Sequence, residues 1–441
     1  MKDLFSHPRF SESVKQIQQL LHDSQKEITS IRPAIDSKKQ HYQELIEEFN
    51  QIRGIPLYYP YIGSSRGRGP FVELLDGSIK YDFIGGIGVH FMGHSHPLMI
   101  EAALKAAVSN TIMQGNLQQN NDSFELMRLL QKASGMDHVY LTSSGAMANE
   151  NALKMAFQKH FPATRILAFE HCFTGRTLAL SQITDKAAYR EGLPSNLSVD
   201  YIPFFNPENP HSTEEALRVL KKHLARYPKQ HAVMIFELVQ GESGFYEGDR
   251  EFFIALMKVL RENKIAILID EVQTFARTPS LFAFHHFGLQ EYADFVTIGK
   301  VGQVCATFFQ KEYSPKVGLI SQTFTSSTSA IQASYVLIEH LINGNYYGKG
   351  GKIEEYHHYF VEKLKQIPQI KGPYGIGAMV AFTPYEGNPQ AVKDLALRLF
   401  DAGVIVFIAG REKMRIRMLL PIGAISKEDI DNVVEILKKV L

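Results

Sequence analysis

The sequence predicts an α/β protein, with a mostly parallel sheet in a large domain and a smaller α+β domain beside it. The main observation is that helical stretches alternate with short apolar runs between about residues 96 and 310. The runs lie at 138–142, 166–170, 232–238, 265–269 and 305–310. This alternation is typical of parallel strands covered by helices on both faces. The second observation is the length of 441 residues, which allows two domains and a large core.

The N-terminal part of the chain lacks this alternation of helical and apolar segments. Residues 10 to 50 are polar with helical spacing, which predicts a helical extension. Prolines and glycines between 55 and 69 predict a loop. The run Phe71–Tyr81 then predicts a β-hairpin, because Asp76-Gly77 is a favoured turn pair.

The C-terminal third predicts a helix over 327–343, a mixed region from 370 onward and a last helix over Lys427–Leu441. We therefore expect three parts. They are an N-terminal helical extension (1–53), a small α+β domain (54–95 with 344–441) and a large α/β domain (96–343).

Composition limits the possible functions. The 47 basic and 46 acidic residues argue against binding to nucleic acid or to an anionic membrane. Two cysteines, Cys172 and Cys305, exclude a disulfide scaffold. The first residues lack the apolar core of a signal peptide, and no apolar run is long enough to span a bilayer. We expect a cytoplasmic protein with small-molecule partners.

Asp270 and Lys300 are the most informative residues. Each follows a short apolar run, 265–269 and 295–298, that reads as a buried strand. Both charges are therefore expected at the C-terminal ends of strands, where open α/β sheets bind their ligands. Pyridoxal phosphate would use both groups. The carboxylate would keep the pyridine nitrogen protonated, and the amine would form a Schiff base with the aldehyde.

A turn of small residues follows the apolar run 138–142. Ser144, Gly145 and Ala146 lead into a helical stretch, and free amides at a helix N-terminus can bind phosphate. Alone, this pattern fits an ordinary strand-to-helix turn better. The glycine spacing of a dinucleotide site is absent.

Other candidates are ambiguous by themselves. Phe173 could stack on a flat aromatic ligand, although such a residue is usually core. Glu237 and Glu242 suggest acid–base work, although surface acids are commoner. Arg417 lies in an apolar run and suits a carboxylate ligand or, equally, an internal salt bridge. No metal is expected, because no second ligand stands at a plausible spacing from the histidines, such as His94, His96, His171, His285 and His286.

The order of these motifs is more specific than any one of them. Over roughly residues 55 to 440 the chain resembles the class III, ornithine-type pyridoxal-phosphate aminotransferases of fold type I. The matching segments are Leu75–Gly77, Ile84–Val89, Gly93–Pro97, Ser144–Ala146, Gly175–Thr177, Ile269–Thr274, Leu281–Phe284, His286–Gly288 and Gly299-Lys300. The run Lys300–Cys305 is similar to the lysine ε-aminotransferase branch, and lacks the triple glycine of the acetylornithine branch.

The resemblance implies roles in binding the cofactor. Lys300 would form the Schiff base and then act as general base for the proton shift, while Asp270 would pair with the pyridinium nitrogen. The other implied contacts are Gly145 and Ala146 with the phosphate, Phe173 and Val272 with the two ring faces, Gln273 with the ring hydroxyl and Thr323 with the phosphate.

The resemblance also implies partners and substrate contacts. Thr323 would reach the phosphate of the neighbouring subunit, which implies a homodimer with active sites at the subunit interface. Arg417 would hold the α-carboxylate of glutamate or 2-oxoglutarate, and Glu242 would cover this arginine when an ω-amine donor binds. Arg176 would help with a donor carboxylate.

The chain departs from the family pattern around the substrate and phosphate edges. Met147 replaces a usual glutamate, Thr174 a histidine and Leu238 a proline. Thr325–Thr328 replaces a Gly-Gly-Asn-Pro run, and the loop after Gln273 is one residue short. These changes bear on the donor substrate more than on the reaction.

We therefore expect an aminotransferase that works by ping-pong half-reactions. The donor would be an ω-amine such as ornithine, acetylornithine, lysine or 4-aminobutyrate, and the acceptor a 2-oxo acid, 2-oxoglutarate. One alternative keeps the cofactor but gives an aminomutase, racemase or decarboxylase. Another is a non-catalytic relative, against which the intact Asp270 and Lys300 argue.

Overall fold

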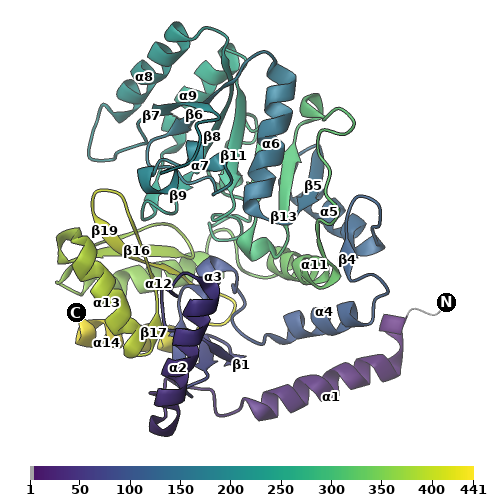
Figure 1. The fold of residues 1–441 in the computed structure, drawn as a ribbon, viewed down its shortest axis with the longest axis vertical. Coiled ribbons are helices and arrows are strands. Elements are labelled where there is room, and N and C mark those ends of the chain that lie inside the picture. Colours follow the sequence, from purple (N-terminus) through teal and green to yellow (C-terminus); the bar gives the residue numbers. More distant parts are fainter. Residues whose placement is uncertain (1–3) are drawn as a thin grey trace. The chain divides into compact units, whose positions relative to one another are not determined.

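The computed structural model describes residues 4–441, which fold as two compact units (Figure 1). Among the described residues, one unit comprises 4–108, 355–374 and 378–441, and we call it the outer-segment unit. The other comprises 109–354 and 375–377, and we call it the central unit. Over the described residues, no helix combines the length and the apolar character needed to traverse a bilayer.

The central unit is built on a seven-stranded sheet. Its strands are β5 (His138–Thr142), β6 (Arg165–Phe169), β7 (Ser198–Ile202), β8 (His231–Phe236), β11 (Ala266–Glu271), β12 (Phe295–Ile298) and β13 (Cys305–Phe309). Their order is β5-β13-β12-β11-β8-β6-β7, and only β13 pairs antiparallel with its neighbours. Every residue of β8 and β11 is buried, as expected for strands covered on both faces.

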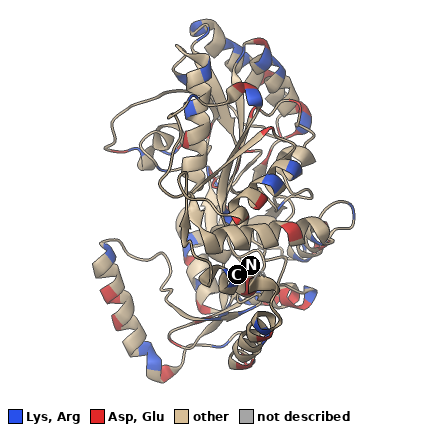
Figure 2. Cartoon of the chain, turned by 90° about the vertical axis from the view of Figure 1, so that its right-hand side faces the viewer, with Lys and Arg blue, Asp and Glu red and all other residues tan. Residues whose placement is uncertain are grey.

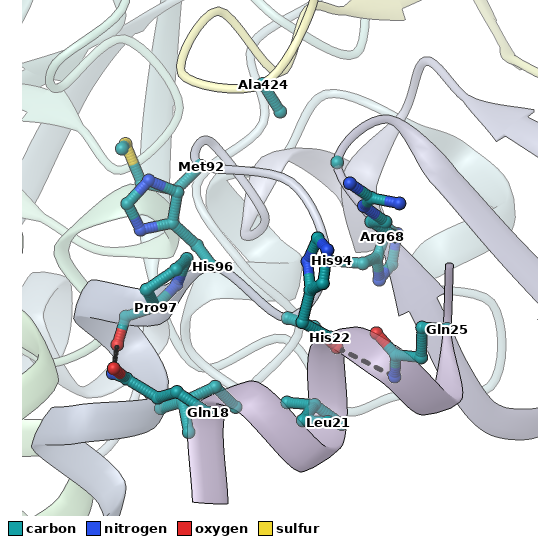
Figure 3. Close-up of a pocket in the computed structure, with 13 residues that line it drawn as sticks. Gln18, Leu21, His22, Gln25, Arg68, Met92, His94, His96, Pro97 and Ala424 are labelled. Atoms are coloured by element: carbon teal, nitrogen blue, oxygen red, sulfur yellow. Dashed lines mark hydrogen bonds between the residues drawn. The ribbon is translucent and has the colours of Figure 1, made fainter. Parts of the chain in front are cut away.

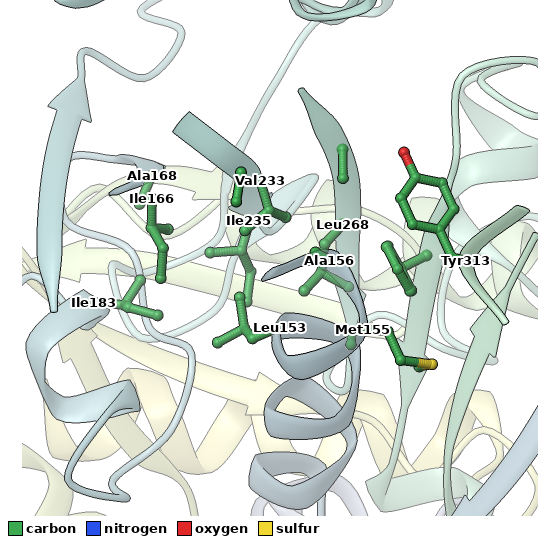
Figure 4. Close-up of a cluster of buried hydrophobic side chains, with 14 of the residues drawn as sticks. Leu153, Met155, Ala156, Ile166, Ala168, Ile183, Val233, Ile235, Leu268 and Tyr313 are labelled. Atoms are coloured by element: carbon green, nitrogen blue, oxygen red, sulfur yellow. The ribbon is translucent and has the colours of Figure 1, made fainter. Parts of the chain in front are cut away.

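Helices pack on this sheet and on one another. They are α5 (Asn121–Ser134), α6 (Gly145–His160), α7 (Leu180–Ile183), α8 (Ser212–Arg226), α9 (Arg250–Glu262), α10 (Ala283–His286) and α11 (Thr328–Asn343). Helix α6 covers one face of the sheet, and α8 and α9 cover the other. The apolar side of α6, with Leu153 and Ala156, packs on Ile235 and Leu268 in the core (Figure 4).

Short elements complete the central unit. They are the strands β4 (Met113–Gln114), β9 (Val239–Gln240), β10 (Tyr246–Glu247) and β14 (Ser326–Ser327), with the 3₁₀ turns η2 (Ala187–Tyr189), η3 (Lys300–Gly302) and η4 (Lys311–Tyr313). The strands form two small antiparallel pairs, β4 with β14 and β9 with β10.

The outer-segment unit holds two four-stranded sheets. The first contains β1 (Gly63–Arg68), β2 (Phe71–Leu74), β3 (Ile79–Asp82) and β17 (Val404–Ile405). The second contains β15 (Ile370–Tyr374), β16 (Met379–Pro384), β18 (Phe407–Gly410) and β19 (Met414–Leu419). Strands from distant parts of the sequence thus meet in the first sheet, where β17 pairs parallel with β3.

The helical elements of this unit are η1 (Leu4–Ser6), α1 (Pro8–Ser24), α2 (Asp36–Arg53), α3 (Gly85–Gly88), α4 (Pro97–Ala107), most of α12 (Lys352–Lys365), η5 (Tyr385–Gly387), α13 (Pro389–Asp401) and α14 (Lys427–Val440). Helix α1 buries only Val14 and α2 only Tyr42 and Ile46, so both are largely exposed. On the side drawn in Figure 2, acidic and basic residues are interspersed over the helices, in keeping with the balanced composition.

The structure confirms the expected fold class, the parallel central strands and the hairpin, where Gly77 has the positive φ of 79° that its turn requires. Two expectations need correction. The segment 55–69 is not all loop, because β1 pairs with β2 across a bulge between Gly63 and Gly67. Strand β7 was not predicted, since Ser198–Ile202 has too few apolar residues to resemble a buried strand.

Candidate active site

Asp270 and Lys300 lie on neighbouring strands at the same edge of the central sheet. Strands β11 and β12 run parallel with Asp270 opposite Thr297, and Lys300 follows the end of β12. Asp270 is only 5% exposed. Lys300 has a φ of 50°, in the left-handed region that side chains rarely adopt. Such backbone strain is concentrated at functional sites, because the surrounding fold must hold it in place.

The Asp270 carboxylate is fixed by two hydrogen bonds. Its Oδ1 accepts from the Val272 amide at 2.9 Å, and its Oδ2 accepts from Asn149 Nδ2 at 2.7 Å. Asn149 is held in turn, because its Oδ1 accepts from the Thr297 hydroxyl at 2.7 Å. Sequence reasoning missed Asn149. The available signal was an asparagine within the apolar helical stretch, one turn after Gly145.

Burial dominates the electrostatics of this edge. It raises the pKa of Asp270 to about 6, against the effect of the hydrogen bonds from Val272 and Asn149 and the charge of Lys300. Burial likewise raises the pKa of Glu237 and of Glu271 to about 8. A cationic group placed beside Asp270 would favour its ionised form.

The turn before α6 packs against the strand ends that carry Asp270 and Lys300. Ser144 caps the helix by accepting the Met147 amide at 3.1 Å. A Cβ on Gly145 would lie 2.7 Å from Val272 Cγ1, and one on Gly299 would lie 3.1 Å from the same atom. The amides of Gly145 and Ala146 lie in the first turn, where a helix offers no acceptor of its own.

Glu237 links the loop that carries Phe173 to the turn that leads to Glu242. Its carboxylate accepts the Phe173 amide at 3.1 Å and the Gly241 amide at 3.0 Å. Glu237 is buried, so the interpretation as a surface acid was wrong for this residue, whereas Glu242 is half-buried. The Gln273 side chain packs against Gly241, because a Cβ added to Gly241 would lie 2.4 Å from Gln273 Oε1.

The remaining candidates lie on other segments of the chain. Arg176 is exposed, with its guanidinium 4.0 Å from the centre of the Tyr189 ring. Thr323 is exposed, in the segment that packs on Gly115. Arg417 belongs to the outer-segment unit, where it is fully buried in β19 with its guanidinium 5.3 Å from the centre of the Phe407 ring.

Within the central unit, these residues suit pyridoxal phosphate. A buried, positioned carboxylate can face the ring nitrogen, a lysine follows the adjacent strand, and a helix N-terminus can receive the phosphate. The close packing of Gly145 on Val272 brings the helix N-terminus next to the strand end that carries Asp270.

Comparison with known proteins agrees with this assignment. The family model for aminotransferase class-III matches residues 58–441. An acetylornithine aminotransferase of Methanocaldococcus jannaschii is 30% identical over 395 residues, covering 85% of this chain and 92% of its own. A [LysW]-aminoadipate semialdehyde transaminase of Deinococcus radiodurans is 28% identical over 389 residues, covering 85% of both chains. The lysine aminotransferase structure from M. tuberculosis superposes with a TM-score of 0.80 at 20% identity, covering 90% of this chain and 99% of its own.

The fold and the family match together define a pyridoxal-phosphate enzyme of fold type I. The chain belongs to the class-III aminotransferase family. It is therefore a pyridoxal-phosphate-dependent enzyme that transfers an amino group between an amino donor and an oxo acid. The expected fold class, cofactor and reaction are confirmed. Residues 4–57, which include α1 and α2, lie outside the family match.

Proposed function

We propose that this aminotransferase takes its amino group from an ω-amine, such as ornithine, acetylornithine, lysine or 4-aminobutyrate, and passes it to 2-oxoglutarate. The names of the relatives, acetylornithine aminotransferase and lysine aminotransferase, support this class of donor. The main structural support for this chemistry is the parallel pairing of β11 and β12, which brings Asp270 and Lys300 to the same edge of the sheet.

In this proposal the chain's residues have separate tasks. When bound, the cofactor supplies an electron sink for the carbanion formed at the substrate carbon. Asp270 keeps a proton on the ring nitrogen, and Asn149 holds Asp270 in position. Lys300 anchors the cofactor, then removes and returns the proton at the substrate carbon. Phe173, Val272 and Gln273 hold the ring, and the amides of Gly145 and Ala146 hold the phosphate.

The substrate contacts belong to the same proposal. Arg417 receives the α-carboxylate of the 2-oxo acid, since its planar fork binds two oxygens at once. Glu242 serves the ω-amine half-reaction, and Arg176 a carboxylate of the donor. We further propose that residues 1–53 form an extension separate from the catalytic domains at 54–95 with 344–441 and at 96–343.

A homodimer with shared active sites is also proposed. Four apolar side chains, Ile112, Leu117, Phe124 and Phe324, are between 48% and 98% exposed. Ile112, Leu117 and Phe324 lie near the segment of Thr323, because the residues near 114 pair with those near 326. Phe124 follows Ser123, whose hydroxyl donates to the Gln114 side chain. Exposed apolar groups gathered in this way mark an interaction surface. We place the enzyme in the cytoplasm, which suits its two free cysteines, Cys172 and Cys305.

The reaction is tested by replacing Lys300 with alanine. The variant should lose the visible absorption band of the bound cofactor and essentially all turnover, while Lys311→Ala, which changes an exposed lysine, should keep both. Full turnover in the Lys300 variant would refute its role.

The donor is identified with a panel of amino donors, each mixed with enzyme alone and read as conversion of the bound cofactor to its amine form. Fast conversion by ω-amines supports the proposal, and conversion only by α-amino acids without an ω-amine contradicts it. Glu242→Ala should slow the ω-amine half-reaction more than the glutamate half-reaction, and equal losses would reject its assigned task.

A further inference from the structure

A cavity of about 310 Å³ lies within the outer-segment unit, where α1 meets the N-terminal end of α4 (Figure 3). Helix α1 contributes Leu21 to its wall, and Gln25 follows directly after the helix. The rest of the unit contributes Arg68, His94, His96 and Ile100. The cavity is distinct from the residues assigned to the reaction. Its volume is within the range of pockets that bind small metabolites.

The lining is rich in basic groups and holds no carboxylate. Arg68 has one long hydrogen bond, to the Lys26 carbonyl at 3.4 Å, and no ion pair with any residue from 4 to 441. Its neighbour on β1, Arg66, is by contrast paired with both Glu27 and Glu73. A guanidinium at a cavity wall without an acidic partner attracts an anion.

Two of the lining histidines, His94 and His96, add polar groups whose orientation is fixed by hydrogen bonds. The His94 ring lies 2.9 Å from the carboxylate of the buried Asp82. The Asp82 carboxylate also accepts the amides of Ile84 and Gly85. His96 caps α4, because its Nδ1 accepts the Leu98 amide at 3.2 Å. Leu21 and Ile100 supply apolar surface, so the cavity suits a ligand with an anionic group and a short carbon chain.

Helix α1 is held on this unit by few interactions. Gln18 Nε2 donates to the Pro97 carbonyl at 3.0 Å, and Arg66 on β1 donates to the carbonyl of Ser24, the last residue of the helix. The buried Gln25, which follows the helix, donates to the Ser95 hydroxyl at 3.4 Å. Only Val14 of the helix is a buried apolar residue. A ligand that touched both Arg68 and the α1 wall would therefore add substantially to the contacts of the helix.

We propose that this cavity binds a small organic anion, a carboxylate or a phosphate ester, through Arg68, and that the bound anion fastens α1 to the rest of the unit. Part of the cavity wall comes from α1, which lies outside the family match at 58–441. It is independent of the proposed donor, since none of its residues takes part in the transfer reaction.

The test uses the full-length protein with its cofactor bound, titrated calorimetrically with inorganic phosphate and, separately, with butyrate. At least one of them should bind saturably, and the better binder shows whether the site favours phosphate or carboxylate. The same anion should slow tryptic cleavage within α1, for example at Lys15, because it stabilises the docked helix.

Substitutions in the cavity wall test whether the anion binds there. Arg68→Gln should weaken it by about tenfold or more, the loss expected for a charge-assisted hydrogen bond. Leu21→Trp should block it by filling the space, which covers the case in which the arginine variant folds poorly. Arg53→Gln is the matched control, because Arg53 also has a single 3.4 Å bond to a backbone carbonyl. The proposal is wrong if neither anion binds saturably. It is also wrong if binding persists in both the Arg68 and the Leu21 variants, because the anion would then bind elsewhere, for example at the active site.

Discussion

Asn149 Nδ2 donates a 2.7 Å hydrogen bond to Asp270 Oδ2, while Asn149 Oδ1 accepts from Thr297 on the strand next to Asp270. The asparagine thereby connects helix α6 to the ends of β11 and β12, which carry the acid and lead to Lys300. All three side chains are buried, so each bond forms where water cannot replace it. The direction of the Asp270 carboxylate is thus set from the helix as well as from its own strand.

Asn149→Leu should therefore impair the enzyme without removing any group assigned to the chemistry. Asp270 loses a bond that lowers its pKa, so this pKa should rise, from about 6 in the cofactor-free protein and from a lower value when the cofactor cation is bound. We expect weaker cofactor binding, and turnover about tenfold to a hundredfold lower, from the loss of a bond to a charged group. The loss of turnover should become larger as the pH falls, because a smaller fraction of Asp270 is then ionised. Turnover measured from pH 6 to 9 checks this expectation.

Asn151→Leu is the matched control for that experiment. Asn151 is buried in the same helix, and its side-chain nitrogen has no partner among the residues described. Replacing it should leave cofactor affinity and the pH profile unchanged. If both leucine variants lose activity with an unchanged pH profile, Asn149 has only a structural role.

The stability of the cofactor-free protein should fall as the pH rises through the titration of Asp270. Burial raises its pKa from the ordinary 3.8 to about 6, so the folded state holds a proton that the unfolded chain has already lost. This stabilisation is complete below about pH 4 and is lost as the pH passes about 6. It amounts to about 3 kcal/mol in the free energy of unfolding.

Urea unfolding at pH 4.5, 5.5 and 7 measures this effect. The asparagine of Asp270→Asn does not titrate. The difference in unfolding free energy between wild type and variant should therefore change by most of the expected ~3 kcal/mol, or about 2 kcal/mol, between pH 4.5 and 7. A constant difference would show that the pKa of Asp270 is not raised. Adding cofactor should reduce the slope, because a cation beside Asp270 favours its ionised form.

The sequence was enough to predict Asp270 and Lys300 at one sheet edge, because both follow apolar runs and parallel strands end on the same side. It could not reveal the bonds of Asn149, which join helix and strand residues 121 positions apart in the chain. Glu237 was seen only as one of two acids after a strand, since hydrogen bonds to the amides of Phe173 and Gly241 leave no pattern. The spacing of residues along the chain therefore does not predict long-range contacts between polar side chains.

Gly145 should not tolerate a side chain. A Cβ there would lie 2.7 and 2.9 Å from the two methyl groups of Val272, closer than real Cβ atoms approach. Gly145→Ala should displace either the helix N-terminus or Val272, so we expect cofactor affinity to fall by about tenfold or more. Equilibrium dialysis of the cofactor measures this change. Gly63→Ala is the control, because a Cβ at Gly63 would meet its nearest atom at an ordinary 3.7 Å. Unchanged affinity in the Gly145 variant would separate this turn from cofactor binding.

Leu117→Glu tests the proposed dimer. Leu117 is 98% exposed and belongs to the apolar group that includes Ile112 and Phe324 near Thr323. A charge buried in a subunit interface without a partner is costly, so the variant should shift toward monomer in sedimentation velocity. It should also lose cofactor affinity if Thr323 reaches the neighbouring site. Val317→Glu, at another fully exposed apolar residue, should leave both properties unchanged. A Leu117 variant that sediments like wild type, or a wild type that sediments as a monomer, would show that this apolar surface does not pair two copies of the chain.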